Sequence, residues 1–277
     1  MLVALLALGS SLSWGTADFL GGSVSRRLPV TTVLVVSGVG AISALLVGVT
    51  AAGGLIAPGR YLWWGVGAGL AGSLALGAFY RALADGTMGA VAPIAATGVV
   101  VPIVVGLATG DDPATLELVG IVAALVGIVL ASSGEVRGAA GGVRTVLLSL
   151  VAAAGFGTFF VLMERGSQTS VGMTLIATRT AGLALALCAA AALRAPVRGW
   201  RPDVRTLVAV GVLDVLANGA FALAAVRGDL SVVSVLSSLY PVVTVLLARR
   251  VHDERLSLPQ AAGVTASLAG VVLMAAG

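Results

Sequence analysis

The sequence predicts an all-α integral membrane protein with ten transmembrane helices, arranged as two inverted five-helix repeats. Three observations support this fold class: the composition, a series of apolar stretches and an internal repeat. Hydrophobic residues make up 58% of the 277 residues, charged residues make up 10%, and the mean hydropathy is +1.09. Soluble domains carry about 25% charged residues. The composition therefore excludes a soluble globular protein.

Ten apolar stretches follow one another along the chain with short polar gaps between them. Each is about 20 residues long, the length that an α-helix needs to cross about 30 Å of hydrocarbon. The first lacks the basic start and the cleavage signal of a secretion signal, so we interpret it as a membrane helix. The expected helices span residues 2–22, 31–51, 62–83, 88–108, 114–133, 144–163, 172–193, 205–226, 230–248 and 257–276.

The two halves of the chain resemble each other when residue 13 is aligned with residue 155. Residues 13–16 (SWGT) then correspond to residues 155–158 (GFGT), and a pair of glycines with the same spacing recurs near the end of each half. A repeat with an odd number of helices must enter the membrane from the opposite side in its second copy, as in many secondary transporters. We expect repeats at residues 1–134 and 144–277, joined by a linker at 135–143.

All sixteen basic residues are arginines, and all but Arg179 lie in or next to the gaps between the apolar stretches. They form no stripe of the kind that binds nucleic acid, so no nucleic-acid partner is expected. Three lie in even-numbered loops (Arg60, Arg165 and Arg227). Twelve lie in odd-numbered loops (Arg26, Arg27, Arg81, Arg137, Arg144, Arg194, Arg198, Arg201, Arg205, Arg249, Arg250 and Arg255). The positive-inside rule predicts a multi-pass plasma-membrane protein with both termini outside the cytoplasm.

Three features of the sequence occur together: Trp14-Gly15, the duplicated five-helix unit, and the segment from Tyr240-Pro241 through residues 253–257 (DERLS) to Gly263 and Gly270. In these features the sequence resembles the EamA-type members of the drug/metabolite transporter superfamily. The resemblance implies transport of small metabolites such as amino acids, nucleobases or drugs without ATP. The first repeat departs from the pattern, because its loop acid is Asp111 and residues 97–98 stand where the second repeat has Pro241.

Ionisable residues inside membrane helices mark candidate sites, because each costs about 2.5–3.5 kcal/mol to insert. Asp18, Arg179, Asp214 and its neighbour Asn218 are such positions, and none recurs in the other repeat. Trp14 lies one turn before Asp18 on the same helix face. We expect Trp14 to stack on or exclude substrate, and Asp18 to bind a cation or proton unless it merely reaches interfacial water.

Arg179 and Asp214 lie on consecutive helices, which leaves two hypotheses open. They form a structural ion pair within the membrane, or Arg179 clamps a substrate carboxylate with its planar guanidinium. Tyr80 and Tyr240 add hydroxyl groups as weaker candidates for the same site.

Prolines and glycines inside the apolar stretches predict breaks and close contacts. Pro93, Pro102 and Pro241 each free a backbone carbonyl, so they are candidates for helix breaks or gating, or for simple kinks. The glycine-rich run 65–72 suits tight helix packing and lacks the lysine of a phosphate loop.

No catalytic, metal or cofactor site is expected. The single histidine, His252, and the single cysteine, Cys188, have no partners in a recognisable catalytic or metal-binding motif. The prediction is a secondary transporter that works by alternating access, with protons as a candidate coupling ion; a passive channel or facilitator is the alternative. Expected partners are the lipid bilayer and a small-molecule substrate, for a monomer or homodimer.

Overall fold

The computed structural model describes residues 1–51, 59–86, 91, 94–131, 142–195, 197–252 and 258–276. In this part every regular element is helical, which confirms the predicted all-α class. The elements are α1 (Leu2–Ser25), α2 (Val30–Ala51), α3 (Tyr61–Asp85), η1 (Thr97–Val99), α5 (Val100–Thr109), α6 (Thr115–Ala131), α7 (Gly142–Ser167), α8 (Val171–Ala192), η2 (Arg201–Asp203), α9 (Val204–Ala225), α10 (Leu230–Ser237), α11 (Tyr240–His252) and α12 (Leu258–Ala276). The expected linker lies outside the described residues up to residue 141.

Six helices in the described part are long and apolar enough to cross a membrane. They span Leu2–Ser25, Val30–Thr50, Tyr61–Asp85, Val143–Ser167, Val171–Ala192 and Arg201–Ala225. Shorter apolar helices span Ile94–Thr109, Thr115–Gly127, Leu230–Thr244 and Ala261–Met274. These segments follow the order of the apolar stretches in the sequence, and they define a multi-pass membrane protein.

Two of the shorter helices are interrupted near a proline. The chain breaks between α10 and α11 just before Pro241, and the 3-10 turn η1 lies just before Pro102 on α5. A proline has no N–H to donate to the preceding turn, which explains why the α-helical ladder is interrupted at these places. Pro93 lies outside the described residues.

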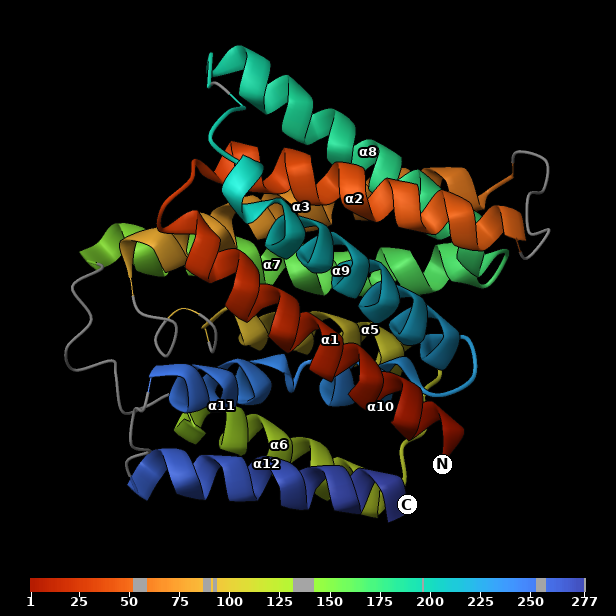
Figure 1. Ribbon diagram of the computed structural model, residues 1–277. Helices are drawn as coiled ribbons and strands as arrows, with labels where there is room; N and C mark the ends of the chain where they lie inside the picture. Colours follow the sequence, from red (N-terminus) through yellow and green to blue (C-terminus); the bar gives the residue numbers. More distant parts are fainter. Residues whose placement is uncertain are drawn as a thin grey trace.

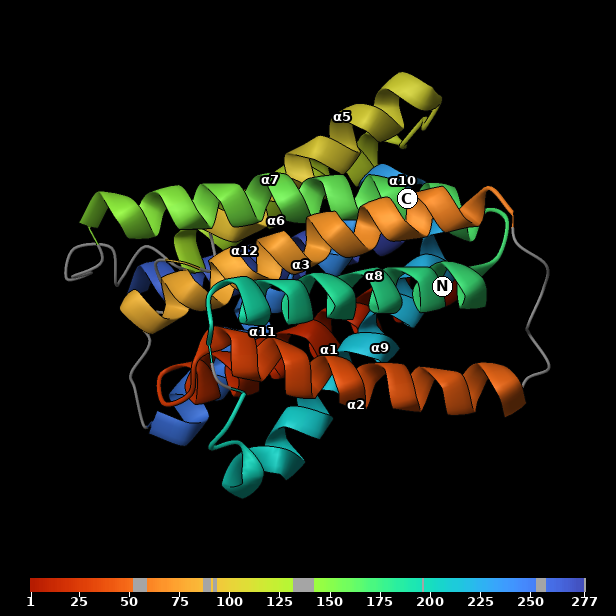
Figure 2. The ribbon, with the colours of Figure 1, turned by 90° about the horizontal axis from the view of Figure 1, so that it is seen from above.

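The long helices pack in a bundle, with helices from the two halves of the chain side by side (Figure 1 and Figure 2). α1 packs along α9, α3 along α7 and α8, and α12 along α6. A Cβ built at Gly120 would lie 2.8 Å from the carbonyl oxygen of Gly270, and one at Gly270 would lie 2.6 Å from that of Gly120. The α6–α12 contact is therefore made by backbones that approach each other at two glycines.

Equivalent glycines make equivalent contacts in the two halves. A Cβ at Gly15 of α1 would lie 2.7 Å from the carbonyl oxygen of Tyr240. Gly157 of α7 is the repeat equivalent of Gly15, and a Cβ there would meet the carbonyl oxygen of Gly98. The close contact of α1 with the chain at the start of α11 therefore has an equivalent in the contact of α7 with η1.

The same correspondence holds for a second pair of crossings. A Cβ at Gly69 of α3 would meet the carbonyl oxygen of Thr178 on α8, and one at Gly211 of α9 would meet that of Ser37 on α2. Gly69 and Gly211 are again equivalent positions in the alignment of the two halves of the sequence. Only a residue without a side chain fits at these four positions, which are Gly15, Gly157, Gly69 and Gly211.

Candidate functional site

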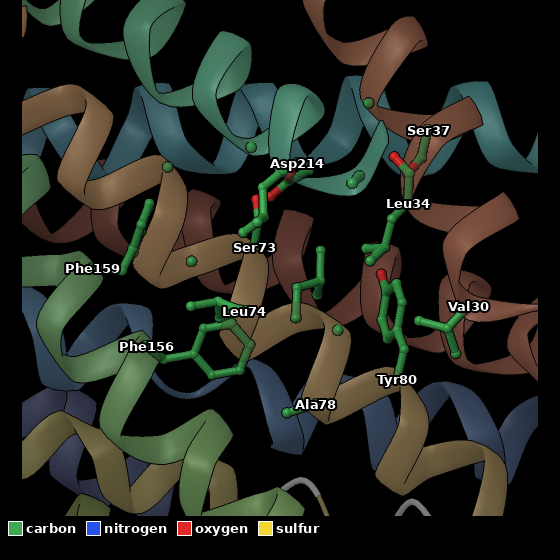
Figure 3. A pocket seen from close by; sticks show the side chains of 18 of the residues that line it. Val30, Leu34, Ser37, Ser73, Leu74, Ala78, Tyr80, Phe156, Phe159 and Asp214 are labelled. Atoms are coloured by element: carbon green, nitrogen blue, oxygen red, sulfur yellow. The ribbon is translucent and has the colours of Figure 1, made fainter. Parts of the chain in front are cut away.

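A cavity of about 740 Å³ lies between α1, α2, α3, α7, α8 and α9 (Figure 3). Its size falls within the range of small-molecule sites, about 300–1,000 Å³. The residues lining it are mostly apolar, with a few polar side chains from separate helices. Among them are all seven candidate binding or coupling residues: Trp14, Asp18, Tyr80, Arg179, Asp214, Asn218 and Tyr240.

Asp214 is the centre of a hydrogen-bonded network that joins three helices. The guanidinium of Arg179 on α8 forms an ion pair with one carboxylate oxygen. The indole N–H of Trp14 on α1 donates to the other oxygen at 3.2 Å, and the amide of Asn218 donates to that oxygen at 2.8 Å. Asp214 is thereby neutralised and held from both sides.

Trp14 also belongs to an aromatic wall. Its ring centroid lies 5.5 Å from that of Phe160, 5.9 Å from that of Phe221 and 6.3 Å from that of Phe159. Such spacings are typical of interacting aromatic side chains. These phenylalanines are not among the residues predicted from the sequence, although Phe160 aligns with Asp18 when the two halves are compared, and this correspondence could have pointed to it.

Asp18 lies deep in the same cavity but outside the Asp214 network. Its side chain is 7% exposed, and within the described part of the chain it makes no hydrogen bond or ion pair. The hydroxyl of Tyr80 lies against α1 at Gly21, one turn beyond Asp18, because a Cβ at Gly21 would lie 2.6 Å from the Tyr80 Cζ atom. An acidic side chain without a partner is thus enclosed by the cavity walls.

Four further polar atoms at the cavity are buried without a hydrogen-bond partner in the described structure. They are the Nε of Arg179, the Oδ1 of Asn218 and the hydroxyls of Tyr240 and Thr31. Buried polar groups are nearly always hydrogen-bonded. Groups left unpaired around a cavity are therefore available to a ligand or to water.

The cavity extends to one end of the bundle and stops before the other. Along α2 the lining residues run from Pro29 to Ala41, and along α8 they run from Thr178 to Ala195. Leu193 and Ala195, which follow the last residue of α8, still line the cavity, so it reaches that end of the bundle. Toward the opposite end α3 and α8 are in tight contact, since a Cβ at Gly65 would lie 2.7 Å from the Cβ of Ala177.

Ion pairs lie near the open end. Arg81 on α3 pairs with Asp85 at 3.1 Å, and Arg27 after α1 pairs with Asp203 of η2 at 2.9 Å. The second pair connects the first half of the chain with the second. Both arginines are well exposed, so these pairs lie in or near solvent.

Comparison with known proteins identifies the fold and the family. The model of the EamA-like transporter family matches residues 143–276. Over this segment, slightly less than half of the chain, the sequence is similar to the EamA-like transporter family. The resemblance expected from the sequence is confirmed, and the family is one of membrane transporters rather than enzymes.

The whole chain also has the fold of a solved structure. That structure, described only as a crystal structure of protein, aligns with a TM-score of 0.74 at 19% sequence identity, covering 99% of this chain and 98% of that chain. At this identity the similarity establishes the fold alone. No curated protein matches the sequence.

Parts of the EamA-like sequence pattern lie away from the cavity. Pro102 and Pro241 are buried in α5 and α11 and are not among the cavity-lining residues, although Tyr240 is. Residues 253–257 lie outside the described residues. Within the described part, no group of three His, Cys, Asp or Glu side chains could hold a metal ion, and Cys188 is exposed on α8.

Asp111, in the loop before α6, connects the two halves of the chain. Its carboxylate accepts a hydrogen bond of 2.8 Å from the backbone N–H of Ser231 in the first turn of α10. Nearby, partial burial and the acidic side chains of Asp111, Glu117 and Asp112 raise the pKa of Asp229. The sequence did not predict this contact, because it depends on how the loop before α6 meets α10.

Proposed function

We propose that the protein is a secondary active transporter of small organic metabolites that works by alternating access. The observation that carries the proposal is the cavity, which is closed toward one end of the bundle and holds an unpaired acidic side chain, Asp18. A passive channel needs a pore that is continuous through the membrane. A cavity closed at one end is the form expected of a carrier in one of its two states.

We further propose ten transmembrane helices in two inverted repeats, residues 1–134 and 144–277, joined by the linker 135–143. The paired glycine contacts support this arrangement, because each contact in one half has an equivalent at the corresponding position of the other. Both termini lie at the same end of the bundle in Figures 1 and 2, as an even number of crossings requires. Inverted repeats allow the two halves to exchange conformations and so expose the site to each side in turn.

The open end of the cavity is proposed to face the cytoplasm. Arg26, Arg27 and Arg81 lie near this end, as do the arginines of the segment between α8 and α9. Loops rich in arginine remain on the cytoplasmic side. The termini would then lie on the outer side of the plasma membrane.

Two different roles are proposed for the acidic residues. Asp214 has a guanidinium, an indole and an amide as partners, so it stabilises the contact of α1 with α8 and α9. Asp18 has none of these, so it is the group free to take up a proton or a cationic solute. This division favours the structural hypothesis for the Arg179–Asp214 pair and the coupling hypothesis for Asp18.

Counterflow in proteoliposomes tests transport directly. Vesicles loaded with unlabelled solute should take up the labelled solute transiently against its gradient, which a channel cannot achieve. The panel comprises amino acids, nucleobases and organic cations, each tested with and without a pH gradient. Saturable counterflow supports the proposal, whereas non-saturable flux without counterflow favours a passive facilitator.

A thiol-blocking variant connects the flux to the cavity. In a Cys188→Ser background, Ser73→Cys places a thiol in the cavity, and Leu70→Cys places one on an exposed face of the same helix. Modification of folded protein with a bulky maleimide should abolish counterflow only in the Ser73→Cys protein. Equal inhibition of both, or of neither, would contradict transport through this cavity.

A further inference from the structure

The charges inside the cavity do not balance. Among the described residues, four charged side chains line it: Asp18, Arg81, Arg179 and Asp214. Arg179 and Asp214 form an ion pair with each other. Arg81 at the open end pairs with Asp85 at 3.1 Å. Asp18, 7% exposed and without a hydrogen bond or ion pair in the described part, is left over. A buried, unpaired carboxylate is costly, so the cavity is completed by one positive charge.

The cavity disfavours an additional anionic group. Arg179 is the one cation deep in its lining, and its guanidinium is already bound to Asp214. A substrate carboxylate placed on the free Nε of Arg179 would lie beside that of Asp214, and like charges at such separations repel. A net positive solute therefore fits this lining better than a zwitterion or an anion.

The unpaired oxygens indicate what kind of cation fits. The carboxylate of Asp18 and the Oδ1 of Asn218 can only accept hydrogen bonds, and the hydroxyl of Tyr240 can accept as well as donate. A protonated amine offers N–H donors to such groups. A quaternary ammonium offers charge but no donor, so it would leave these oxygens unsatisfied.

The remaining walls indicate the body of the solute. Trp14, Phe156, Phe159 and Phe160 all line the cavity. Figure 3 shows Phe156 and Phe159 on one side of it, with Val30 and Leu34 of α2 on the other. Aromatic walls bury apolar surface and attract cations through their ring faces. A cavity of about 740 Å³ accommodates an amine with a ring-sized apolar group.

We infer that the solute is a primary or secondary organic ammonium with an apolar, ring-sized body, bound by its N–H donors at Asp18. This inference rests on the proposed function. The carboxyl of Asp18 holds either a proton or the ammonium, so binding of the amine releases one proton from a protonated Asp18. Transport is then an exchange of one protonated amine for one proton.

Calorimetry on the purified full chain in lipid nanodiscs tests the class of solute. The probes share a phenyl group: 2-phenylethylammonium, its N,N,N-trimethyl derivative, phenylalanine, 3-phenylpropionate and 2-phenylethanol. We expect 2-phenylethylammonium to bind most tightly, and buffers of different ionisation enthalpy to reveal proton release. Tighter binding of phenylalanine, of the anion or of the trimethyl derivative would overturn the inference.

Variants test the position of the amine. Asp18→Asn should weaken 2-phenylethylammonium binding by about 30-fold or more, because it removes one partner of a buried charge pair. Asp203→Asn, which removes a carboxylate outside the cavity lining, is the control and should bind as the wild type does. If Asp18→Asn fails to fold, Asp18→Glu keeps the charge and should retain proton release. Unchanged affinity in Asp18→Asn would refute the inference.

The transport panel separates failure of this inference from failure of the proposed function. Counterflow of a solute without an amine, together with no binding of 2-phenylethylammonium, refutes the amine inference and leaves the transporter intact. Binding of the amine at Asp18 with no counterflow of any solute refutes transport instead.

Discussion

The Arg179–Asp214 pair is expected to be a structural ion pair whose members are strongly coupled. Arg179→Gln would leave the carboxylate of Asp214 without its cation in a site where the side chain is 19% exposed. Removing one partner of a buried pair costs about 3–5 kcal/mol. We expect the lower end, about 3 kcal/mol, because both side chains border a cavity that can hold water and Asp214 keeps its bonds from Trp14 and Asn218.

The double variant separates structure from function. With Arg179→Gln and Asp214→Asn together, neither position of this pair carries an unpaired charge, and an amide can still face Trp14. The double variant should therefore be more stable than either single variant, with a coupling energy of at least about 2 kcal/mol. It should also retain counterflow, since the proposed coupling group, Asp18, is untouched.

The assay is equilibrium unfolding in mixed micelles, in which the proportion of a denaturing detergent is increased stepwise and unfolding is monitored by circular dichroism. The exposed pair Arg27–Asp203, with side chains 65% and 18% exposed, serves as the control. Removal of either member of that pair should cost about 0–1 kcal/mol. The reasoning is refuted if single variants of the buried pair cost no more than the control, or if their effects simply add in the double variant.

Gly69→Ala and Gly211→Ala should each cost about 1–3 kcal/mol through overpacking, because the new methyl group meets a backbone carbonyl of the facing helix. Gly48→Ala, where a Cβ meets nothing within 4 Å, is their control and should not lower the melting temperature. Burial and acidic neighbours raise the pKa of Asp229, so its ionisation opposes folding as pH rises. Asp229→Asn should therefore raise the free energy of unfolding near neutral pH. Below the ordinary aspartate pKa, where Asp229 of the wild type is protonated in both states, unfolding titrations should show no such gain. Trp14→Phe should keep the aromatic contacts yet cost about 1.5–3 kcal/mol, measured by the same unfolding assay, because it removes a hydrogen bond to a charged group.

The helices could be predicted because hydrophobicity and length act locally along the chain. A run of about 20 apolar residues must satisfy its backbone hydrogen bonds internally in lipid, so it forms a helix whatever surrounds it. The break before α11 carries a local signal as well, since Pro241 cannot donate an N–H. The family pattern extends across the same segment, which is why it was recognisable from the sequence.

The contacts of the site depend on how deep each helix lies in the membrane and how it is rotated about its axis, and the sequence specifies neither. Trp14 and Asp214 lie far apart along the chain, and their hydrogen bond exists because α1 packs along α9. The Arg179–Asp214 pair requires two helices to bring side chains to one depth, and helix tilt determines this. The pairing of Asp111 with Ser231 likewise follows from tertiary packing.

The molecule combines a repeated scaffold with a site that occurs once. Glycine contacts recur at equivalent places, as Gly15 and Gly157 illustrate, whereas Asp18 has Phe160 as its equivalent. Alternating access needs two conformations of similar free energy, and scaffold contacts common to both halves favour that balance because the halves can exchange roles. Ligand recognition instead favours a residue that occurs in one half only, because two equivalent carboxylates facing one cavity would repel each other. Duplicated glycines with a single unpaired acid are thus what a carrier with one positively charged ligand requires.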